Sequence, residues 1–261
     1  MQSNISTKGK MEFSGRLHLP QCQSTNDEMQ HILAENRNSL PEGFLLSTGH
    51  QTAGRGQRGS RWDSEPEKNL LFSLLLRPKF LDCRYAFRLT ATLALAIARV
   101  LEVEFPEMKL KWPNDLYLQE KKLGGMLIET VISGPNLERA VCGIGLNINQ
   151  ANPGPQAVSL YDVLGKELDR EKLLQQIYQS LMQEYSRLRN GEWPAIRQAY
   201  LARLFRLGQP SWFRLPDGTR FQAVLKSVSE EGELILICRD GEKRFRFKEV
   251  QFEIQGDHLA I

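Results

Sequence analysis

Apolar and polar positions follow strand and helix patterns up to about residue 205. Residues 70–77 form a continuous apolar run, which is typical of a strand buried on both faces. A stretch rich in Ala and Leu at 83–104 predicts a long helix, and further helices are expected at 24–36, at 169–190 and from Trp193 onward. Other strands are expected at 16–22, 44–51, 108–112, 116–119, 126–132 and 140–148.

The pattern changes at Leu207, where short alternating strands replace the helices. Asp-Gly and Glu-Gly dipeptides, which favour hairpin turns, separate them. These strands are expected at 211–215, 220–229, 233–239 and 244–254. Helices mixed with neighbouring strands, followed by an all-β tail, predict an α+β domain at 1–205 and a small β-barrel at 206–261.

Composition excludes several classes of protein. The chain is 41% hydrophobic and 25% charged, as globular proteins are, and no apolar run approaches the roughly 20 residues that cross a bilayer. The N-terminus lacks a secretory pattern. No two of the four cysteines have metal-ligand or C-x-x-C spacing, so reduced thiols in a cytoplasmic protein are expected. The cysteines are Cys22, Cys83, Cys142 and Cys238.

Charge gives no support to a nucleic-acid-binding protein. The net charge is only +3, which is too small to indicate a nucleic-acid partner. A module that bound nucleic acid through the C-terminal barrel would need an excess of basic residues there. Residues 204–261 contain nine Lys or Arg and nine Asp or Glu, so the barrel is neutral.

A loop at 54–59 has the sequence GRGQRG, which fits the G-x-G-x-x-G spacing of dinucleotide-binding proteins. That motif requires a helix directly after it, and the following residues 60–66, SRWDSEP, do not form one. The loop is nevertheless rich in glycine and arginine, so it could wrap an anion with backbone N–H groups and guanidinium groups. A mobile basic surface loop is the alternative.

Two further segments could meet a nucleotide. Residues 111–115, KWPND, are an ordinary turn when taken alone, but a lysine, an aromatic ring and an aspartate also suit ATP and Mg²⁺. In residues 121–125, KKLGG, the glycines allow close approach of a ligand, and a lysine beside them could stabilise charge on a reacting phosphate. A solvated lysine pair at a hairpin tip is the alternative.

Two segments carry weaker signals. In 143–149, GIGLNIN, glycines alternate along a strand, which suggests that something packs against the backbone there; a bulge or a helix crossing would explain them equally well. Ser24-Thr25-Asn26 precedes a helix and forms a good N-cap, with Thr25 and Glu28 at capping-box spacing. Its polar groups could also hold a neutral polar ligand.

Taken in order, these five segments resemble the biotin protein ligase family, also called biotin–[acetyl-CoA-carboxylase] ligases. The family pattern is a Ser-Thr-Asn, a G-R-G-x-x-G loop closed by Trp62, K-W-P-N-D, K-x-G-G with a downstream Glu129, and G-I-G-x-N. The resemblance spans residues 24–149.

The resemblance implies a catalytic domain like that of class II aminoacyl-tRNA synthetases, a mixed sheet flanked by helices, followed by an SH3-like barrel. It implies that biotin and ATP react, with Mg²⁺, to give biotinyl-5′-AMP and pyrophosphate. Biotin is then transferred to a lysine of a biotin carboxyl carrier protein or domain. It leaves the oligomeric state open between a monomer and a homodimer.

The resemblance also assigns residues. Two are implied in catalysis: Lys122, which bridges the biotin carboxylate and the α-phosphate, and Arg55. Those implied in biotin binding are Ser24, Thr25, Asn26, Gln51, Arg55, Gly56, Gln57, Lys122, Gly124 and Gly125. Those implied in binding ATP or the adenylate are Arg58, Arg61, Trp62, Lys111, Asn114, Asp115 and Asn147, with Mg²⁺ at Asp115.

The chain departs from the family pattern in two respects. Gln57 and Ser60 stand where family members often carry arginines, so Arg58 and Arg61 are expected to meet the phosphates instead. A strand at 16–22 begins almost at once, so no DNA-binding domain is expected ahead of the catalytic one. A lipoate or octanoate ligase, which shares the adenylate chemistry, is the closest competing function, but it would need a more apolar pocket than Ser24-Thr25-Asn26 with Gln51 provides.

Overall fold

A computed structural model of the chain describes residues 11–12, 15–35 and 40–254. Its larger part is a mixed sheet of eight strands in the order β1-β2-β3-β6-β10-β9-β8-β7. Only β2 and β3 pair in parallel; the other neighbours are antiparallel. The strands are β1 (Met11–Glu12), β2 (Arg16–Leu19), β3 (Leu45–Thr48), β6 (Leu70–Leu76), β7 (Met108–Lys111), β8 (Asp115–Leu118), β9 (Lys121–Ser133) and β10 (Asn136–Leu146).

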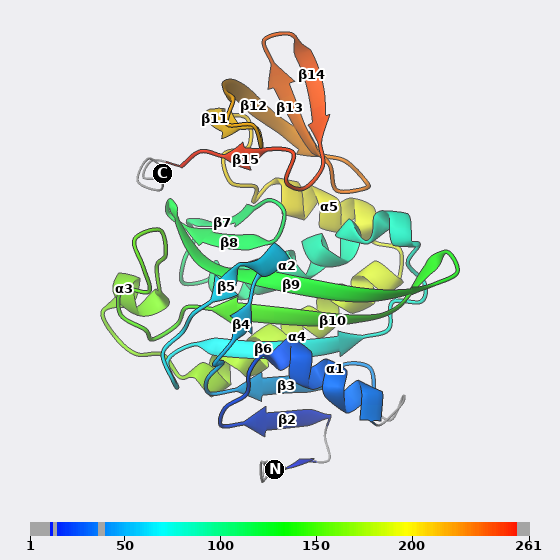
Figure 1. Cartoon of the computed structure of the whole chain (residues 1–261), viewed down its shortest axis with the longest axis vertical. Helices are drawn as coiled ribbons and strands as arrows, with labels where there is room; N and C mark the ends of the chain where they lie inside the picture. Colours follow the sequence, from blue (N-terminus) through cyan, green and yellow to red (C-terminus); the bar gives the residue numbers. More distant parts are fainter. Residues whose placement is uncertain (1–10, 13–14, 36–39, 255–261) are drawn as a thin grey trace.

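Helices cover both faces of this sheet (Figure 1). On one face lie α1 and a short hairpin, β4–β5, whose tip is a 3-10 turn, η1. On the other face α2 packs on the sheet and α4 and α5 pack on α2. The bounds are α1 (Thr25–Glu35), β4 (Gly54–Arg55), η1 (Gln57–Gly59), β5 (Arg61–Trp62), η2 (Cys83–Tyr85), α2 (Phe87–Leu101), α3 (Leu160–Leu164), α4 (Arg170–Arg189) and α5 (Trp193–Leu201).

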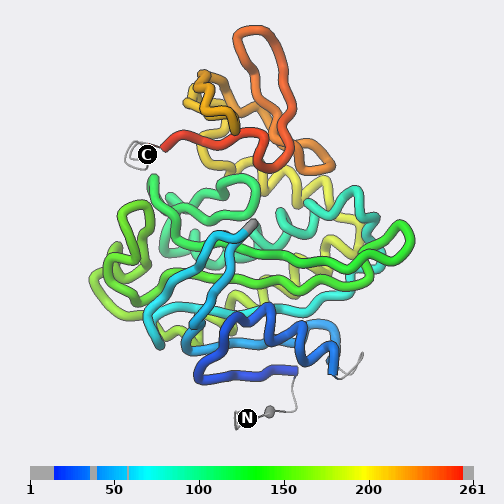
Figure 2. The backbone as a smooth tube through the Cα atoms, viewed as in Figure 1, coloured from blue at the N-terminus to red at the C-terminus, as the bar shows by residue number. Residues whose placement is uncertain are grey.

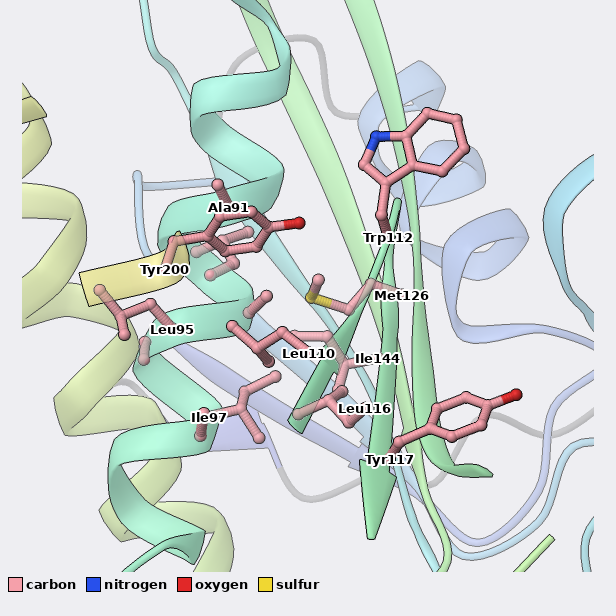
Figure 3. Close-up of a cluster of buried hydrophobic side chains, with 14 of the residues drawn as sticks. Ala91, Leu95, Ile97, Leu110, Trp112, Leu116, Tyr117, Met126, Ile144 and Tyr200 are labelled. Carbon is pink, nitrogen blue, oxygen red and sulfur yellow. The ribbon is translucent and has the colours of Figure 1, made fainter. Parts of the chain in front are cut away.

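The main core lies between the sheet and α2. Figure 3 shows side chains from the helix meeting side chains from the strands, among them Leu95, Ile97, Leu110, Leu116 and Ile144. All seven residues of β6 are buried, as the continuous apolar run predicts. Complete burial of each such leucine or isoleucine contributes roughly 1.5–3 kcal/mol, so this layer fixes the sheet firmly.

A smaller antiparallel sheet follows α5, in the order β14-β13-β12-β11-β15. It lies at the end of the molecule opposite β2, above α5 and the β7–β8 hairpin (Figure 2). The Trp112 indole N–H donates to the Gly232 carbonyl at 2.9 Å, which ties the two sheets together. The strands are β11 (Pro210–Arg214), β12 (Arg220–Val228), β13 (Leu234–Cys238), β14 (Gly241–Phe245) and β15 (Gln251–Phe252).

The predicted α+β class is confirmed, but three local predictions are wrong. The helix expected at 83–104 is divided into η2 and α2, because the Asp82 carboxylate accepts from Arg84 N–H and starts a separate turn. The strand expected at 244–254 is two strands, since the chain turns at Lys248 (φ +76°) and β15 pairs with β11. Thr25 is the first helical residue, and it bonds to Gln51 rather than forming a capping box.

In the part of the chain that the structure describes, no helix is both long and apolar enough to cross a membrane.

Candidate active site

A cavity of about 370 Å³ opens on the α1 face of the large sheet. Its walls come from the start of α1, the β4–β5 hairpin, the β7–β8 turn, β9, β10 and the last turn and strand of the small sheet. Fourteen of the residues singled out from the sequence line it: Ser24, Thr25, Asn26, Gln51, Arg55, Gly56, Gln57, Arg61, Trp62, Lys111, Asn114, Asp115, Lys122 and Gly125.

Three others are placed differently. A Cβ on Gly124 would lie 2.6 Å from the Gly145 carbonyl oxygen, so this glycine serves the packing of β9 on β10. Asn147 is buried outside the lining, and its backbone bonds to Leu123 and Leu160. The side chain of Arg58 lies outside the described part of the structure.

One end of the cavity is neutral and polar. The side chains of Ser24, Thr25 and Asn26 are buried, and Gln51 Oε1 accepts hydrogen bonds from the Thr25 N–H at 2.8 Å and the Thr25 hydroxyl at 3.1 Å. Asn26 Nδ2 donates to the Leu127 carbonyl at 3.1 Å. Because these groups are already oriented by one another, this end is built to hydrogen-bond a polar ligand that carries no charge.

Ser73 fixes the two key side chains of this polar end. Its hydroxyl donates to Asn26 Oδ1 at 2.7 Å and lies 2.8 Å from the Thr25 hydroxyl oxygen. Ser73 is fully buried in β6 and points to the α1 face, whereas its neighbours Phe72 and Leu74 point to the α2 core. Ser73 is the one polar residue of β6, and a polar residue inside an otherwise apolar strand is a signal that the sequence did contain.

The two alternating glycines of β10 provide room for side chains of the site. A Cβ on Gly143 would lie 2.5 Å from Asn26 Oδ1, and one on Gly145 would lie 2.7 Å from the ring of Trp62. The expectation that something packs against this backbone is therefore confirmed. The groups that do so are an asparagine and an indole ring from the chain itself.

The other end of the cavity is cationic. Lys122 Nζ lies 2.7 Å from Asp115 Oδ1, and a Cβ on Gly125 would come within 3.2 Å of Lys122 Nζ. Arg61, Lys111 and Lys122 line the cavity against a single carboxylate among the described lining residues, that of Asp115, while the Arg55 guanidinium in the lining is paired with Asp27 and Glu129. This excess of positive charge suits a polyanionic ligand.

A bulge in β9 directs Lys122 toward the cavity. The pairing of β8 with β9 shifts between Leu116 and Tyr117, so that Leu123 is an extra residue. Leu123 is buried in the core, and Lys122 lies opposite Tyr117 of β8 while its backbone hydrogen-bonds to residues 156–158 on its other side. Bulges re-aim side chains beside active sites in this way. Lys122 therefore reaches the cavity, whereas Lys121 is exposed and lies outside its lining.

Trp62 closes the space between the polar and the cationic ends. Its indole Nε1 is buried and has no hydrogen-bond partner, and Lys122 Nζ lies 5.9 Å from the ring centroid. The side-chain oxygen of Gln57 is likewise buried and unpartnered. Buried polar atoms are normally paired, so these two are exceptions among the residues that line the cavity.

Arg55 makes contacts that the sequence did not predict. Its guanidinium donates to Asp27 of α1 and to Glu129 of β9. Desolvation opposes the charged form of Arg55, but the hydrogen bond and charge of Glu129 and the charge of Asp27 outweigh it and raise the pKa above its ordinary value. Arg55 therefore stays charged, and its guanidinium forms ion pairs with two carboxylates.

Comparison with known proteins identifies the family. The model of the biotin/lipoate A/B protein ligase family matches residues 19–147. A biotin–[acetyl-CoA-carboxylase] ligase of Paracoccus denitrificans is 32% identical over 197 residues, which cover 71% of this chain and 80% of that protein. The bifunctional ligase/repressor BirA of Bacillus subtilis is 28% identical over 235 residues, which cover 87% of this chain and 71% of that protein.

The chain belongs to the biotin protein ligase family.

A solved structure supports the same assignment. The biotin protein ligase from Aquifex aeolicus, in complex with biotin and ATP, superimposes with a TM-score of 0.77 at 26% identity. The match covers 93% of this chain and all of that one. The likeness therefore includes the small C-terminal sheet as well as the large one.

The C-terminal sheet supplies a wall of the site that the family motifs do not include. Phe247, Val250, Gln251 and Phe252 line the cavity. Phe252 also packs on Phe205, with ring centroids 6.0 Å apart. No local motif marks this segment, because its place depends on how the second sheet docks on the first.

The metal site expected at Asp115 has few ligands. Within the described residues, no group of three or more His, Cys, Asp or Glu side chains could hold a metal ion. Asp115 can contribute one carboxylate, and Mg²⁺ is commonly held by one or two carboxylates together with substrate phosphates and water. The donor set therefore fits Mg²⁺ only if a phosphate group completes it.

Asn114 and Lys111 of the KWPND segment also form hydrogen bonds within the protein. The Asn114 amide donates to the Met126 carbonyl, and the Met126 N–H donates to the Asn114 carbonyl at 3.0 Å. These bonds hold the β7–β8 turn against β9. Lys111 Nζ donates to the Tyr117 hydroxyl at 3.1 Å, which keeps its charge at the cavity wall.

Proposed function

We propose that this protein is a biotin protein ligase, which joins biotin to ATP as biotinyl-5′-AMP and then transfers biotin to a lysine of a carrier domain. One observation carries the proposal. A single cavity has a buried neutral end, suited to the ureido ring of biotin, and an adjoining cationic end, suited to a triphosphate. Membership of the family and the likeness to the Aquifex aeolicus enzyme with biotin and ATP support it.

In the first step the biotin carboxylate attacks the α-phosphorus of ATP. A C–O–P bond forms, and the bond to pyrophosphate breaks. Negative charge gathers on the phosphoryl oxygens, where a fixed cation stabilises the transition state. Lys122 is placed for this role, since it lines the cavity with its ammonium 5.9 Å from the Trp62 ring centroid. Asp115 holds its ammonium in position before the substrates bind.

In the second step the neutral amine of the acceptor lysine attacks the biotinyl carbonyl, an amide forms, and AMP leaves with the electron pair of the broken bond. The acyl-adenylate also reacts with water, so it must be sheltered until the carrier arrives. The β4–β5 hairpin lies over the cavity and can provide that shelter.

Mg²⁺ is part of the proposal. It would be held by Asp115 together with oxygens of the ATP phosphates, and it would neutralise part of their charge when bound. Lys111, Arg61 and the Trp62 indole are proposed to contact the nucleotide, because they line the cavity beside Asp115.

Finer assignments follow the family resemblance. We propose a class II aminoacyl-tRNA synthetase-like catalytic domain at 1–205 and an SH3-like barrel at 206–261. The partner is a biotin carboxyl carrier protein or domain of a carboxylase, as the name of the Paracoccus denitrificans relative suggests. The four cysteines are free, which agrees with a cytoplasmic location. Sedimentation velocity would decide between a monomer and a homodimer.

Pyrophosphate release tests the function directly. Biotin with MgATP is expected to give one pyrophosphate per protein rapidly, and lipoate or octanoate is expected to give almost none. A lipoate ligase shares the adenylate chemistry, but the comparisons do not favour it, and its ligand has no ureido group for Thr25 and Asn26. Release with lipoate and not with biotin would overturn the proposal.

A further inference from the structure

Two side chains of the β4–β5 hairpin contact the protein body: the Trp62 ring packs on Gly145 of β10, and Arg55 forms ion pairs. At its base, the Ala53 N–H bonds to the Gln23 carbonyl at 2.9 Å. Beyond the base, the backbone hydrogen bonds of residues 54–62 are internal to the hairpin. Of the hairpin side chains that the structure describes, Arg55 is the one that hydrogen-bonds to the rest of the protein. Arg55 Nε donates to Asp27 Oδ2 at 3.1 Å, and its Nη2 donates to Asp27 Oδ1 at 2.5 Å and to Glu129 Oε1 at 3.0 Å.

The carboxylates that hold Arg55 lie outside the cavity. Neither Asp27 nor Glu129 belongs to its lining, and they come from different elements, α1 and β9. Glu129 also accepts from Asn26 Nδ2 at 2.8 Å. The same carboxylate therefore bonds both to the hairpin and to a residue of the polar end of the site.

We propose that Asp27 and Glu129 are positioning residues that latch the hairpin over the site through Arg55, so that the acyl-adenylate is retained until the acceptor lysine arrives. This inference rests on the proposed function. Arg55 then acts through the position of the hairpin and does not meet the phosphates, because two carboxylates already oppose its charge.

The strength of the latch fits a lid that must reopen. The side chains of Arg55, Asp27 and Glu129 are 41%, 49% and 31% exposed. Partly exposed ion pairs shift an equilibrium only a few-fold each, so two of them together favour the closed hairpin by about tenfold. A buried pair would hold the adenylate too firmly for transfer.

Proteolysis of the ligand-free protein tests the latch without any assumption about the reaction. Trypsin can cut after Arg55, Arg58 and Arg61. Asp27→Asn removes one of the two ion pairs and is expected to increase cleavage in this hairpin about threefold. Glu171→Gln is the matched control, because Glu171 forms an ion pair with Arg16 at the edge of the large sheet. Equal cleavage of the wild type, the control and Asp27→Asn would overturn the latch.

The rate at which the adenylate leaves the enzyme tests whether the latch retains it. Labelled biotinyl-5′-AMP is formed on the enzyme and chased with unlabelled biotin and ATP. Asp27→Asn is expected to lose the label about threefold faster than the wild type, while pyrophosphate release in the first turnover changes less than twofold. Glu129→Gln should lose it to a similar extent, since it removes the other carboxylate that pairs with Arg55.

A double mutant separates the latch from a direct role of Arg55. If Arg55 acts only through the latch, Arg55→Gln combined with Asp27→Asn loses the adenylate no faster than Arg55→Gln alone. A large fall in first-turnover pyrophosphate release with Arg55→Gln, absent with Asp27→Asn, would show contact with the phosphates and overturn the proposal. If no variant and no wild type forms an adenylate, the proposed function fails, and the proteolysis result still decides whether the latch exists.

Discussion

Lys122 Nζ lies 2.7 Å from Asp115 Oδ1, and the absence of a side chain at Gly125 keeps the space around this pair open. The pair brings together the KWPND and KKLGG segments, each of which the sequence could explain without a ligand. It places a cation and a carboxylate together in the wall of the cavity. Three of the predictions below concern residues that orient this site, and one concerns the sheet that encloses it.

Lys122→Ala is expected to reduce adenylate formation about 100-fold or more, while biotin binding changes much less, because the ammonium is needed most where charge develops. Single-turnover pyrophosphate release and a biotin titration measure the two effects. Lys121→Ala is the control, since Lys121 is exposed and points away from the cavity. Equal activity of the two variants would remove Lys122 from the mechanism.

Gly143→Ala and Gly145→Ala should affect different substrates. A methyl group at 143 displaces the Asn26 amide, and one at 145 displaces the Trp62 ring. Overpacking of this kind costs about 1–3 kcal/mol, which corresponds to roughly five- to 150-fold where the displaced group contacts the substrate. We expect a raised KM for biotin in the first variant and for ATP in the second. The same loss for both substrates in both variants would contradict this division of the cavity.

Ser73→Ala should lower the free energy of unfolding by about 1–3 kcal/mol, because it leaves the buried Asn26 Oδ1 without its donor. It should also weaken biotin binding. Ser180→Ala is a matched control, since the Ser180 hydroxyl donates to the Ala96 carbonyl at 2.8 Å far from the cavity. Urea denaturation and biotin titration should show a stability loss in both variants and an affinity loss in Ser73→Ala alone.

Glu230→Gln is expected to raise the KM for ATP several-fold and to leave biotin affinity unchanged. The Glu230 carboxylate accepts from Arg88 at 2.9 Å and from the Trp193 indole, and so fastens the small sheet to α2 and α5. Loosening it should displace the segment around Phe252 that walls the cavity. Glu242→Gln, whose partner Lys226 lies within the small sheet, is the control. An unchanged KM for ATP would show that the small sheet does not need this anchor.

The elements of the fold could largely be predicted because their signals are local. The apolar run of β6, the length of α4 and the turns of the small sheet each depend on residues close together in the chain. The errors arose where a single side chain or a tertiary pairing decided the boundary. Asp82 separated η2 from α2, and pairing with β11 drew β15 away from β14.

The residue types of the site could be predicted from the sequence, but only part of their arrangement in space could. The sequence alone indicated which segments carry polar, cationic and glycine-rich residues, because residue type and spacing belong to the chain itself. It could not indicate that Ser73 orients Asn26, or that Phe247 and Phe252 close the cavity, since those contacts join residues far apart in sequence.

Tertiary structure alone decided the direction of two cations. A bulge in β9 turns Lys122 into the cavity, and Asp27 and Glu129 pair with the Arg55 guanidinium at the cavity wall. Both residues are equally visible in the sequence as positive charges beside glycines. The direction of a charged side chain depends on strand register and on the partners that folding brings within hydrogen-bond distance. Neither can be predicted from the neighbouring residues in the sequence.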